Sequence, residues 1–297
     1  MNYYLIEILS FWGIVIVGSV ATLKTVLTSK DLALRKYAIF NLTSFLIRTL
    51  AIQMVLAALF INYSSFFSLH ESWVPFQGFK IIGYFIFADF LFYVYHRLEH
   101  VIPYLWSGHS SHHSGEIMHV SLILRQNVIA NIFTLPFGLL GIPFSLNPLG
   151  ISACIKFIIF YQSLIHFTVK RDVPILNYVF VTPYNHIIHH SALYEGAGQN
   201  YGGILNIWDR FCGTYRTGSK YLEKFGIPGL KNPDNLWNLN FYHILQLLRD
   251  CWDKRSIRPF FIPNHIKFKS NVNLPTTLAY TFCLSLTIFI IVKFLAT

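Results

Sequence analysis

Long apolar runs separated by short polar links dominate the first hundred residues of the chain. Residues 4–23, 37–61 and 79–95 are almost continuously apolar, and a further run of this kind covers residues 274–295. A helix needs about 20 apolar residues to cross the hydrocarbon core of a bilayer. The pattern therefore predicts about four transmembrane helices. The first run has no basic residues ahead of it and no A-x-A-like cleavage site, so we expect a retained anchor.

Two more apolar runs, residues 127–146 and 151–169, flank the sequence Asn147-Pro-Leu-Gly150, which is typical of a turn. They predict a helical hairpin that enters the membrane and returns to the same side. Pro136 and Pro143 can kink its first arm. Whether the hairpin crosses the membrane fully or dips into it is therefore left open.

The basic residues predict the orientation of these helices. Residues 24–36 carry four Lys or Arg side chains, whereas residues 62–77 carry none. Cytoplasmic links are the ones enriched in Lys and Arg. The span at 79–95 then returns the chain to the cytoplasm, which is where the histidine-rich segments that follow it should lie. His70 falls on the opposite side and is excluded from their site.

Composition agrees with a polytopic membrane protein. The chain is 54% hydrophobic and 12% charged, against roughly 25% charged residues in soluble domains. Its net charge of +10 is explained by basic cytoplasmic links and also suits anionic lipids or an acidic redox partner. No nucleic-acid partner is expected. The four cysteines form no C-x-x-C pair, which favours a reducing compartment. We expect a bacterial inner membrane or the endoplasmic reticulum.

Histidine is concentrated in three short windows, residues 96–100, 109–113 and 186–190. They hold 8 of the 13 histidines, whereas an even distribution would put about 0.7 there. Residues three and four apart share one face of a helix, and neutral imidazole suits zinc, copper, iron and nickel. Eight ligands are too many for one tetrahedral ion, so the spacing predicts two adjacent metal ions. The predicted ligands are His96, His100, His109, His112, His113, His186, His189 and His190.

Three other interpretations compete with this one. Clustered histidines can sense pH, since free imidazole titrates near pH ~6.5. A membrane zinc hydrolase would use a metal-bound water and a carboxylate base, but the chain has no H-E-x-x-H. A metal transporter would place histidines through the bilayer, whereas these windows fall at one face of it.

The windows resemble the histidine boxes of the fatty acid hydroxylase/sterol desaturase superfamily. The resemblance covers roughly residues 75–220 and includes Asn200-Tyr-Gly-Gly-x4-Trp208-Asp209-Arg-Phe-x-Gly-Thr-Tyr215 after the last box. Gln162-x3-His166 is similar to the family's intervening box, which adds His166 as a ninth ligand. Leu105-Trp-x-Gly-His109-x-x-His-His-Ser-x-Glu116 and Leu124-Arg-Gln126 resemble the alkylglycerol monooxygenase-like branch most. His119 departs from the Asn expected there.

The resemblance implies an all-α integral membrane protein whose transmembrane helices are capped by a cytoplasmic, helical, histidine-rich metal domain. It divides the chain into N-terminal transmembrane helices (1–78), a catalytic domain (79–220) and a cytoplasmic segment with a last transmembrane helix (221–297). It also implies a di-iron centre that uses O2 to hydroxylate or desaturate an acyl, alkyl-ether or sterol lipid. Zinc competes well for imidazole, so purified protein can carry it.

Other residues are expected to support the ligands, and electrons are expected to come from outside. Carboxylates and amides near a metal often accept the second ring N–H of a histidine ligand. The residues expected in such supporting positions are Asp89, Glu99, Glu116, His119, Gln162, Asn200 and Asp209. The chain has no flavin, nicotinamide or haem motif. An external donor protein or small reductant is therefore required, and the alkylglycerol branch implies tetrahydrobiopterin.

Overall fold

The computed structural model describes residues 3–68, 80–128, 148–169, 171–193 and 199–262. These residues are mostly helical and contain no β-strand, as expected for an all-α protein. The longer helices are α1 (Tyr3–Thr28), α2 (Leu32–Ser68), α3 (Lys80–Val101), α4 (Pro103–His113), α6 (Pro148–Leu164) and α10 (Leu236–Asp253). The short ones are η1 (Val120–Leu124), α7 (Pro174–Val179), α8 (Pro183–His189), α9 (Ile207–Phe211), η3 (Ser219–Leu222) and α11 (Arg258–Phe261).

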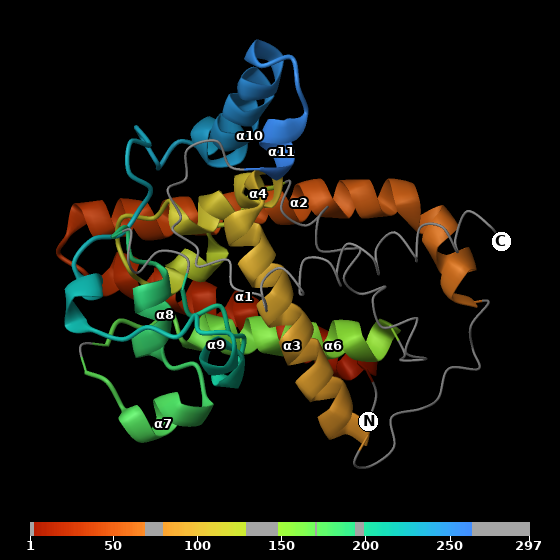
Figure 1. The fold of residues 1–297 in the computed structure, drawn as a ribbon, viewed down its shortest axis with the longest axis horizontal. Coiled ribbons are helices and arrows are strands. Elements are labelled where there is room, and N and C mark those ends of the chain that lie inside the picture. The colour runs from red at the N-terminus through yellow and green to blue at the C-terminus, as the bar shows by residue number, and fades with distance from the viewer. Residues whose placement is uncertain (1–2, 69–79, 129–147, 170, 194–198, 263–297) are drawn as a thin grey trace.

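Helices α1, α2 and α6 run side by side across the molecule, and α3 crosses them (Figure 1). Close packing depends in part on glycine, since a Cβ atom on Gly13 of α1 would lie 2.5 Å from the ring of Phe160 in α6. Helix α3 buries Tyr84, Ala88 and Leu91 against apolar residues of α6. This packing places the carboxyl ends of α3 and α6 near each other.

Among the described residues, one helix is long and apolar enough to cross a membrane. It is the Leu9–Thr28 part of α1, with a mean hydropathy of 1.6. The predicted runs at 37–61 and 79–95 form helices, α2 and α3, but the number of membrane crossings stays a prediction. The run at 274–295 lies outside the described residues.

The second arm of the predicted hairpin is helix α6, whereas most of the first arm lies outside the described residues. The predicted turn at 147–150 is partly wrong, because α6 already begins at Pro148. Proline is tolerated at the first helical position, where its missing N–H would have no partner within the helix. The helix ends at Leu164, just before His166.

Candidate metal centre

Each histidine box lies on a helix, as the spacing predicted. Helix α3 carries the first box in its last turns, α4 carries the second, and α8 carries the third. Both α4 and α8 begin with proline at the first helical positions. Thr182 and Asn185 close a reciprocal capping box at the start of α8, which satisfies backbone N–H groups that the helix itself leaves unpaired. The third box is therefore rigidly built despite the shortness of its helix.

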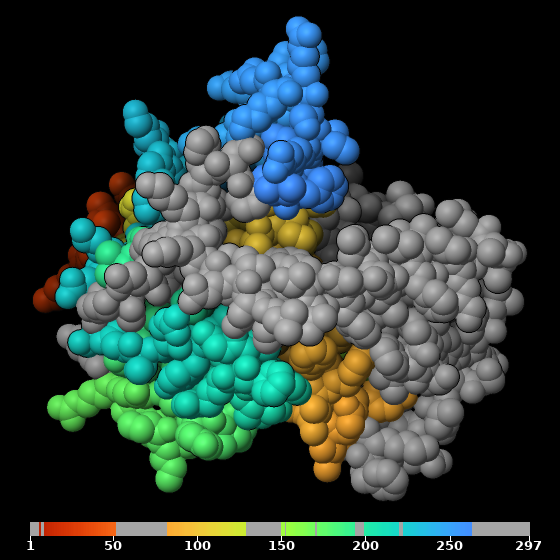
Figure 2. Space-filling model, viewed as in Figure 1, coloured from red at the N-terminus to blue at the C-terminus, as the bar shows by residue number. Residues whose placement is uncertain are grey.

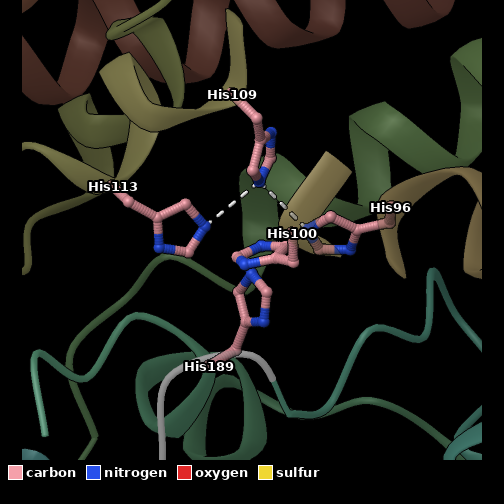
Figure 3. A group of neighbouring side chains, drawn as sticks. All are labelled: His96, His100, His109, His113 and His189. Atoms are coloured by element: carbon pink, nitrogen blue, oxygen red, sulfur yellow. Dashed lines mark hydrogen bonds between the residues drawn. The ribbon is translucent and has the colours of Figure 1, made fainter. Parts of the chain in front are cut away.

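The nine predicted histidines converge on two adjoining groups. The potential ligand atoms within each group all lie within 4.8 Å of one another. The five-histidine group comprises His96, His100, His109, His113 and His189, and Figure 3 shows their rings turned toward a common centre. The four-histidine group comprises His112, His166, His186 and His190. The groups adjoin through the stacked rings of His113 and His190, whose centroids are 4.4 Å apart.

The second and third boxes each divide their histidines between the two groups. In α4, His109 and His113 belong to the five-histidine group, while His112 belongs to the other. In the third box the assignment is reversed, and His189 alone joins the five-histidine group. Residues four apart lie one above the other on a helix, whereas the residue between them is rotated away. Each box therefore contributes to both groups at once.

The spacing of the ring nitrogens fits a metal ion in each group. The Nε2 atom of His109 lies 3.2 Å from that of His96 and 3.1 Å from that of His113. In the four-histidine group, Nε2 atoms lie 3.0–3.1 Å apart in the pairs His112/His166, His166/His186 and His186/His190. Two nitrogens bound to one ion at about 2.0–2.1 Å lie about 2.9–3.4 Å apart, as the bond angle goes from about 90° to tetrahedral. The buried Nε2 atoms of His100 and His189 have no hydrogen-bond partner within the described part of the chain, which also fits a metal ligand.

The outer ring nitrogens of several histidines contact fixed acceptors. His96 Nδ1 lies 3.0 Å from the Tyr201 carbonyl oxygen, and His189 Nδ1 lies 2.8 Å from that of Gln199. His109 Nδ1 lies 3.3 Å from a Glu99 carboxylate oxygen, as predicted for Glu99. A proton on Nδ1 that is donated to such an acceptor leaves the Nε2 lone pair free for a metal.

Electrostatics favour neutral rings throughout the site. Burial lowers the pKa of His109, His113 and His190 well below the ordinary histidine value, and the neighbouring imidazoles lower it further. Neutral imidazole is the form that binds metals. The indole ring of Trp106 packs beside the five-histidine group, 5.2 Å from the His100 ring centroid. An apolar wall of this kind limits the access of water to the group.

No described histidine donates a hydrogen bond to Asp89, contrary to the expectation that it accepts one from a ligand. Its carboxylate accepts hydrogen bonds from the backbone N–H groups of Ile204 and Leu205 and from the Trp208 indole. Gly203 permits this approach, because a Cβ there would lie 2.7 Å from Asp89 Oδ1. Asp89 lies in the middle of α3, where the backbone N–H groups already form hydrogen bonds within the helix. The N–H groups that donate to Asp89 therefore come from a segment distant in sequence.

Asp209 holds the same segment from the other side. It accepts hydrogen bonds from the backbone N–H groups of Tyr201 and Gly202, at 2.8 and 2.7 Å. Two buried carboxylates therefore bind backbone N–H groups at both ends of residues 201–205. Because the Tyr201 carbonyl contacts His96, this arrangement fixes the acceptor of a predicted ligand.

Gln162 and Asn200 also act through the backbone. The Gln162 side chain donates to the carbonyl oxygens of Gly202 and Gly203, so it supports the site rather than joining either group. Asn200 donates to the Asn185 carbonyl oxygen at 3.1 Å, which braces the start of α8 as predicted. Its φ of 55° lies in the left-handed region, which Asn tolerates better than most residues.

Glu116 and His119 are not part of the site, contrary to prediction. Glu116 is exposed, and no described histidine donates a hydrogen bond to it. His119 begins η1, where its Nδ1 accepts from the Ser121 backbone N–H at 3.1 Å. Its Nε2 therefore carries the proton and donates to Thr25 Oγ1 at 3.0 Å. His119 thus links η1 to α1.

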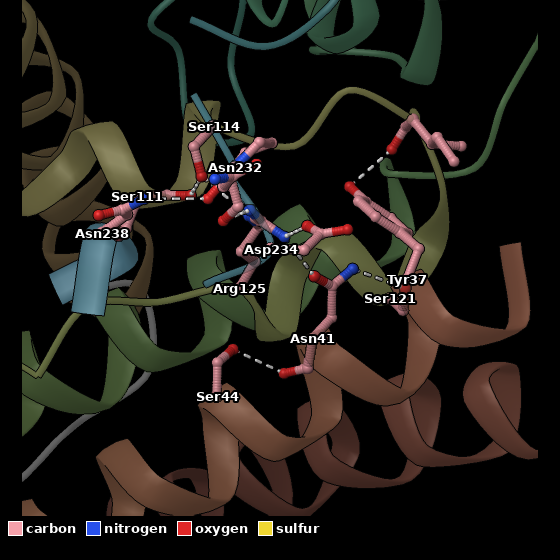
Figure 4. Close-up of polar contacts among 12 residues, drawn as sticks. Tyr37, Asn41, Ser44, Ser111, Ser114, Ser121, Arg125, Asn232, Asp234 and Asn238 are labelled. Carbon is pink, nitrogen blue, oxygen red and sulfur yellow. Dashed lines mark hydrogen bonds and ion pairs between the residues drawn. The ribbon is translucent and has the colours of Figure 1, made fainter. Parts of the chain in front are cut away.

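Arg125 forms a buried polar network that the sequence did not identify (Figure 4). Its guanidinium donates to Ser114 Oγ at 2.9 Å, Asn41 Oδ1 at 3.1 Å, Asp234 Oδ1 at 2.7 Å and the Pro233 carbonyl oxygen at 2.5 Å. The contact with Asp234 is a salt bridge. Ser114 follows the last histidine of α4, so the network ties the second box to α2 and to the segment before α10.

Replacing Arg125 with lysine is expected to destabilise the protein by about 2–3 kcal/mol, because one ammonium group cannot reach four acceptors and leaves buried oxygens unpaired. The melting temperature of the purified protein in detergent measures the effect. Asp234→Asn is the matched control. It alters only the half-exposed end of the network and keeps one side-chain oxygen as an acceptor, so its cost should be smaller than that of Arg125→Lys. Equal melting temperatures for Arg125→Lys and the wild type would contradict the network's role.

The described part of the chain is a mostly helical protein with two adjoining all-histidine clusters that could hold metal ions. Comparison with known proteins agrees. Residues 81–214, which contain all nine histidines of the clusters, match the fatty acid hydroxylase family model, so this part of the chain is similar to that family.

Among curated proteins, the chain is similar to alkylglycerol monooxygenases. It is 34% identical to the one from Danio rerio over 180 residues, which are 58% of this chain and 38% of the relative. It is 29% identical to the human protein over 57% of this chain and 37% of the relative. The predicted resemblance to this branch is confirmed.

A bacterial relative has a different substrate in its name. The chain is 33% identical to an ornithine lipid hydroxylase of Rhizobium tropici over 156 residues, 50% of this chain and 46% of the relative. The chain matches less than half the length of each of these relatives. No solved structure matches it significantly.

Proposed function

We propose that this protein is an O2-dependent di-iron lipid hydroxylase, with the nine clustered histidines as its metal ligands. The observation that carries the proposal is the convergence of nine imidazoles, eight of them buried, into two adjoining groups, within the segment that matches the fatty acid hydroxylase family model. Bound iron would supply the O2 chemistry that oxidation of an unactivated C–H bond needs and that side chains alone cannot perform.

Each group of histidines would hold one ion. His96 and His189 would present Nε2 to the metal because their Nδ1 atoms donate to backbone carbonyls, and His109 would do so because Glu99 accepts from its Nδ1. The segment 201–205, held by Asp89 and Asp209, would keep the His96 ring in place. Trp106 would exclude water from the five-histidine group, which favours oxidation of an apolar chain over side reactions with water.

We propose a membrane lipid with an acyl, alkyl-ether or sterol chain as the substrate. Similarity to alkylglycerol monooxygenases and to an ornithine lipid hydroxylase supports a lipid. These relatives are named a monooxygenase and a hydroxylase, so we propose hydroxylation rather than desaturation. Electrons would come from a protein donor or a small reductant, and tetrahydrobiopterin is the first reductant to test.

We also propose that the protein crosses the membrane several times, with its metal centre on the cytoplasmic side. The apolar helix α1 and the basic residues over 24–36, where α1 ends and α2 begins, support this orientation. The catalytic domain at residues 79–220 would then lie between the N-terminal membrane helices and the segment 221–297.

Purified protein loaded with ferrous iron is expected to hold about two iron ions per chain, since an imidazole cluster of this size exceeds the needs of one ion. With 18O2 and a reductant, the oxidised lipid should gain one 18O atom. Elemental analysis and mass spectrometry of the lipid measure the two quantities. The control uses 18O-labelled water with ordinary O2. Label that entered the product from water alone would contradict the proposal and favour a metal hydrolase.

A further inference from the structure

Helix α10 has three distinct faces along its whole length. One face buries Leu239 and Leu247, and the helix packs against α4, which carries the second histidine box. A second face is polar and exposed, with Gln246 and Arg249 among its residues. The third face is apolar and largely exposed.

The apolar face is a continuous stripe that begins and ends with tryptophan. It comprises Trp237, Phe241, Leu245, Leu248 and Trp252, whose positions i, i+4, i+8, i+11 and i+15 share one side of a helix. Trp237 is 62% exposed, Leu248 is 48% exposed and Trp252 is 83% exposed. Exposed apolar stripes of this size on a helix mark contact with a membrane or a partner.

Basic residues favour a membrane over an apolar protein partner. The end of α10 and the turn into α11 expose Arg249, Lys254, Arg255 and Arg258. Only two acidic residues, Asp250 and Asp253, accompany them there. Basic side chains beside an apolar stripe are attracted to anionic lipid headgroups, and tryptophan favours the membrane–water boundary.

The direction of α10 agrees with such a position. In Figure 1, α1 and α2 run across the picture, while α10 stands crosswise to them. If α1 crosses the bilayer, α10 runs roughly parallel to its surface. Figure 2 shows α10 and α11 as a ridge that projects from the body of the molecule, so the stripe is accessible to a flat surface.

We propose that α10 is an interfacial helix, whose apolar stripe lies in the headgroup region of an anionic bilayer. Amphipathic helices of this kind bury their apolar face about 5–10 Å deep at the boundary between headgroups and acyl chains. Because α10 also packs on α4, it ties the second histidine box to the membrane surface. The helix would lie there whatever reaction the metal centre catalyses, so its position can be tested without an activity assay.

The test places a fluorescent label on α10 in the full-length chain, reconstituted into vesicles of phosphatidylcholine and phosphatidylglycerol. Leu248→Cys and its matched control Gln246→Cys are made in a background whose four native cysteines are alanine. Lipids brominated near the headgroup should quench the label at 248 by about half and leave that at 246 nearly unchanged, given the shallow burial of interfacial helices. Aqueous iodide should quench in the reverse order.

Two results would overturn the proposal. Equal access of iodide to both labels would show that the stripe faces water. Protection of position 248 from iodide without quenching by the brominated lipid would show that protein covers it, either another part of this chain or a second copy. If the cysteine-free chain does not fold, the native chain provides the test. Trp237→Phe with Trp252→Phe should then reduce the quenching of tryptophan fluorescence by brominated lipid, and unchanged quenching would refute the proposal.

Discussion

Replacing His112 with alanine is expected to abolish lipid oxidation while leaving the protein in the membrane. His112 is one of four histidines in its group, and its Nε2 atom lies 3.1 Å from that of His166. Loss of residues that merely support metal ligands typically costs 10–100-fold in metal affinity or activity, so loss of a ligand should reduce turnover by more than about 100-fold. We also expect about one iron ion per chain to be lost. Lipid profiling measures the loss of turnover, and elemental analysis measures the loss of iron.

His119→Asn is the matched control, because it removes a histidine close in sequence but outside both groups. Asparagine is a favoured residue at a helix start, and it can replace the contact of His119 with the Ser121 backbone. Iron content and turnover should therefore stay near those of the wild type. Full activity of His112→Ala, or equal loss of iron in both variants, would contradict the assignment of the two groups.

Replacing Asp89 with alanine is expected to destabilise the protein by about 3–5 kcal/mol, since it leaves one buried and two partly buried N–H groups without an acceptor. The same change should weaken iron binding to the five-histidine group by about 10–100-fold, because the segment that supports His96 is no longer held. Thermal melting measures the first effect. Iron titration followed by visible absorption measures the second, at a temperature where both proteins are folded.

Asp31→Ala controls for the loss of an aspartate. Asp31 accepts from the backbone N–H groups of Ala33 and Leu34 at the exposed start of α2, so its loss should lower stability slightly and leave iron binding unchanged. Asp89→Asn keeps one carbonyl oxygen as an acceptor and should recover part of the lost affinity. If the folded Asp89→Ala protein binds iron as tightly as the wild type, Asp89 contributes to stability alone and the prediction for iron binding is contradicted.

Local patterns predicted the helices, and they selected histidines that the fold brings together. Apolar runs located α1, α2 and α3 because a run of about 20 apolar residues favours a helix in any context. The i, i+3 and i+4 spacing identified eight histidines because helix geometry alone places such side chains on one face. His166 has no second histidine near it in sequence, and only the family resemblance identified it.

Supporting residues were harder to predict, because their partners are distant in sequence. Asp89 meets donors at residues 204–208, which lie more than one hundred residues away. His119 resembles a ligand by proximity to the second box, yet its ring turns toward α1. Arg125 has partners in three separate segments. No local spacing encodes contacts of this kind.

The sequence by itself determined which imidazoles are available and that each box presents them on one helix face. Only the tertiary structure decided that they divide into five and four, with the middle histidine of each of the second and third boxes joining the opposite group. The physical reason is that the helical repeat fixes directions within one helix, whereas the meeting of rings depends on how α3, α4, α6 and α8 are rotated against one another. That rotation is set by side-chain packing and by the buried carboxylates that hold residues 201–205 in place.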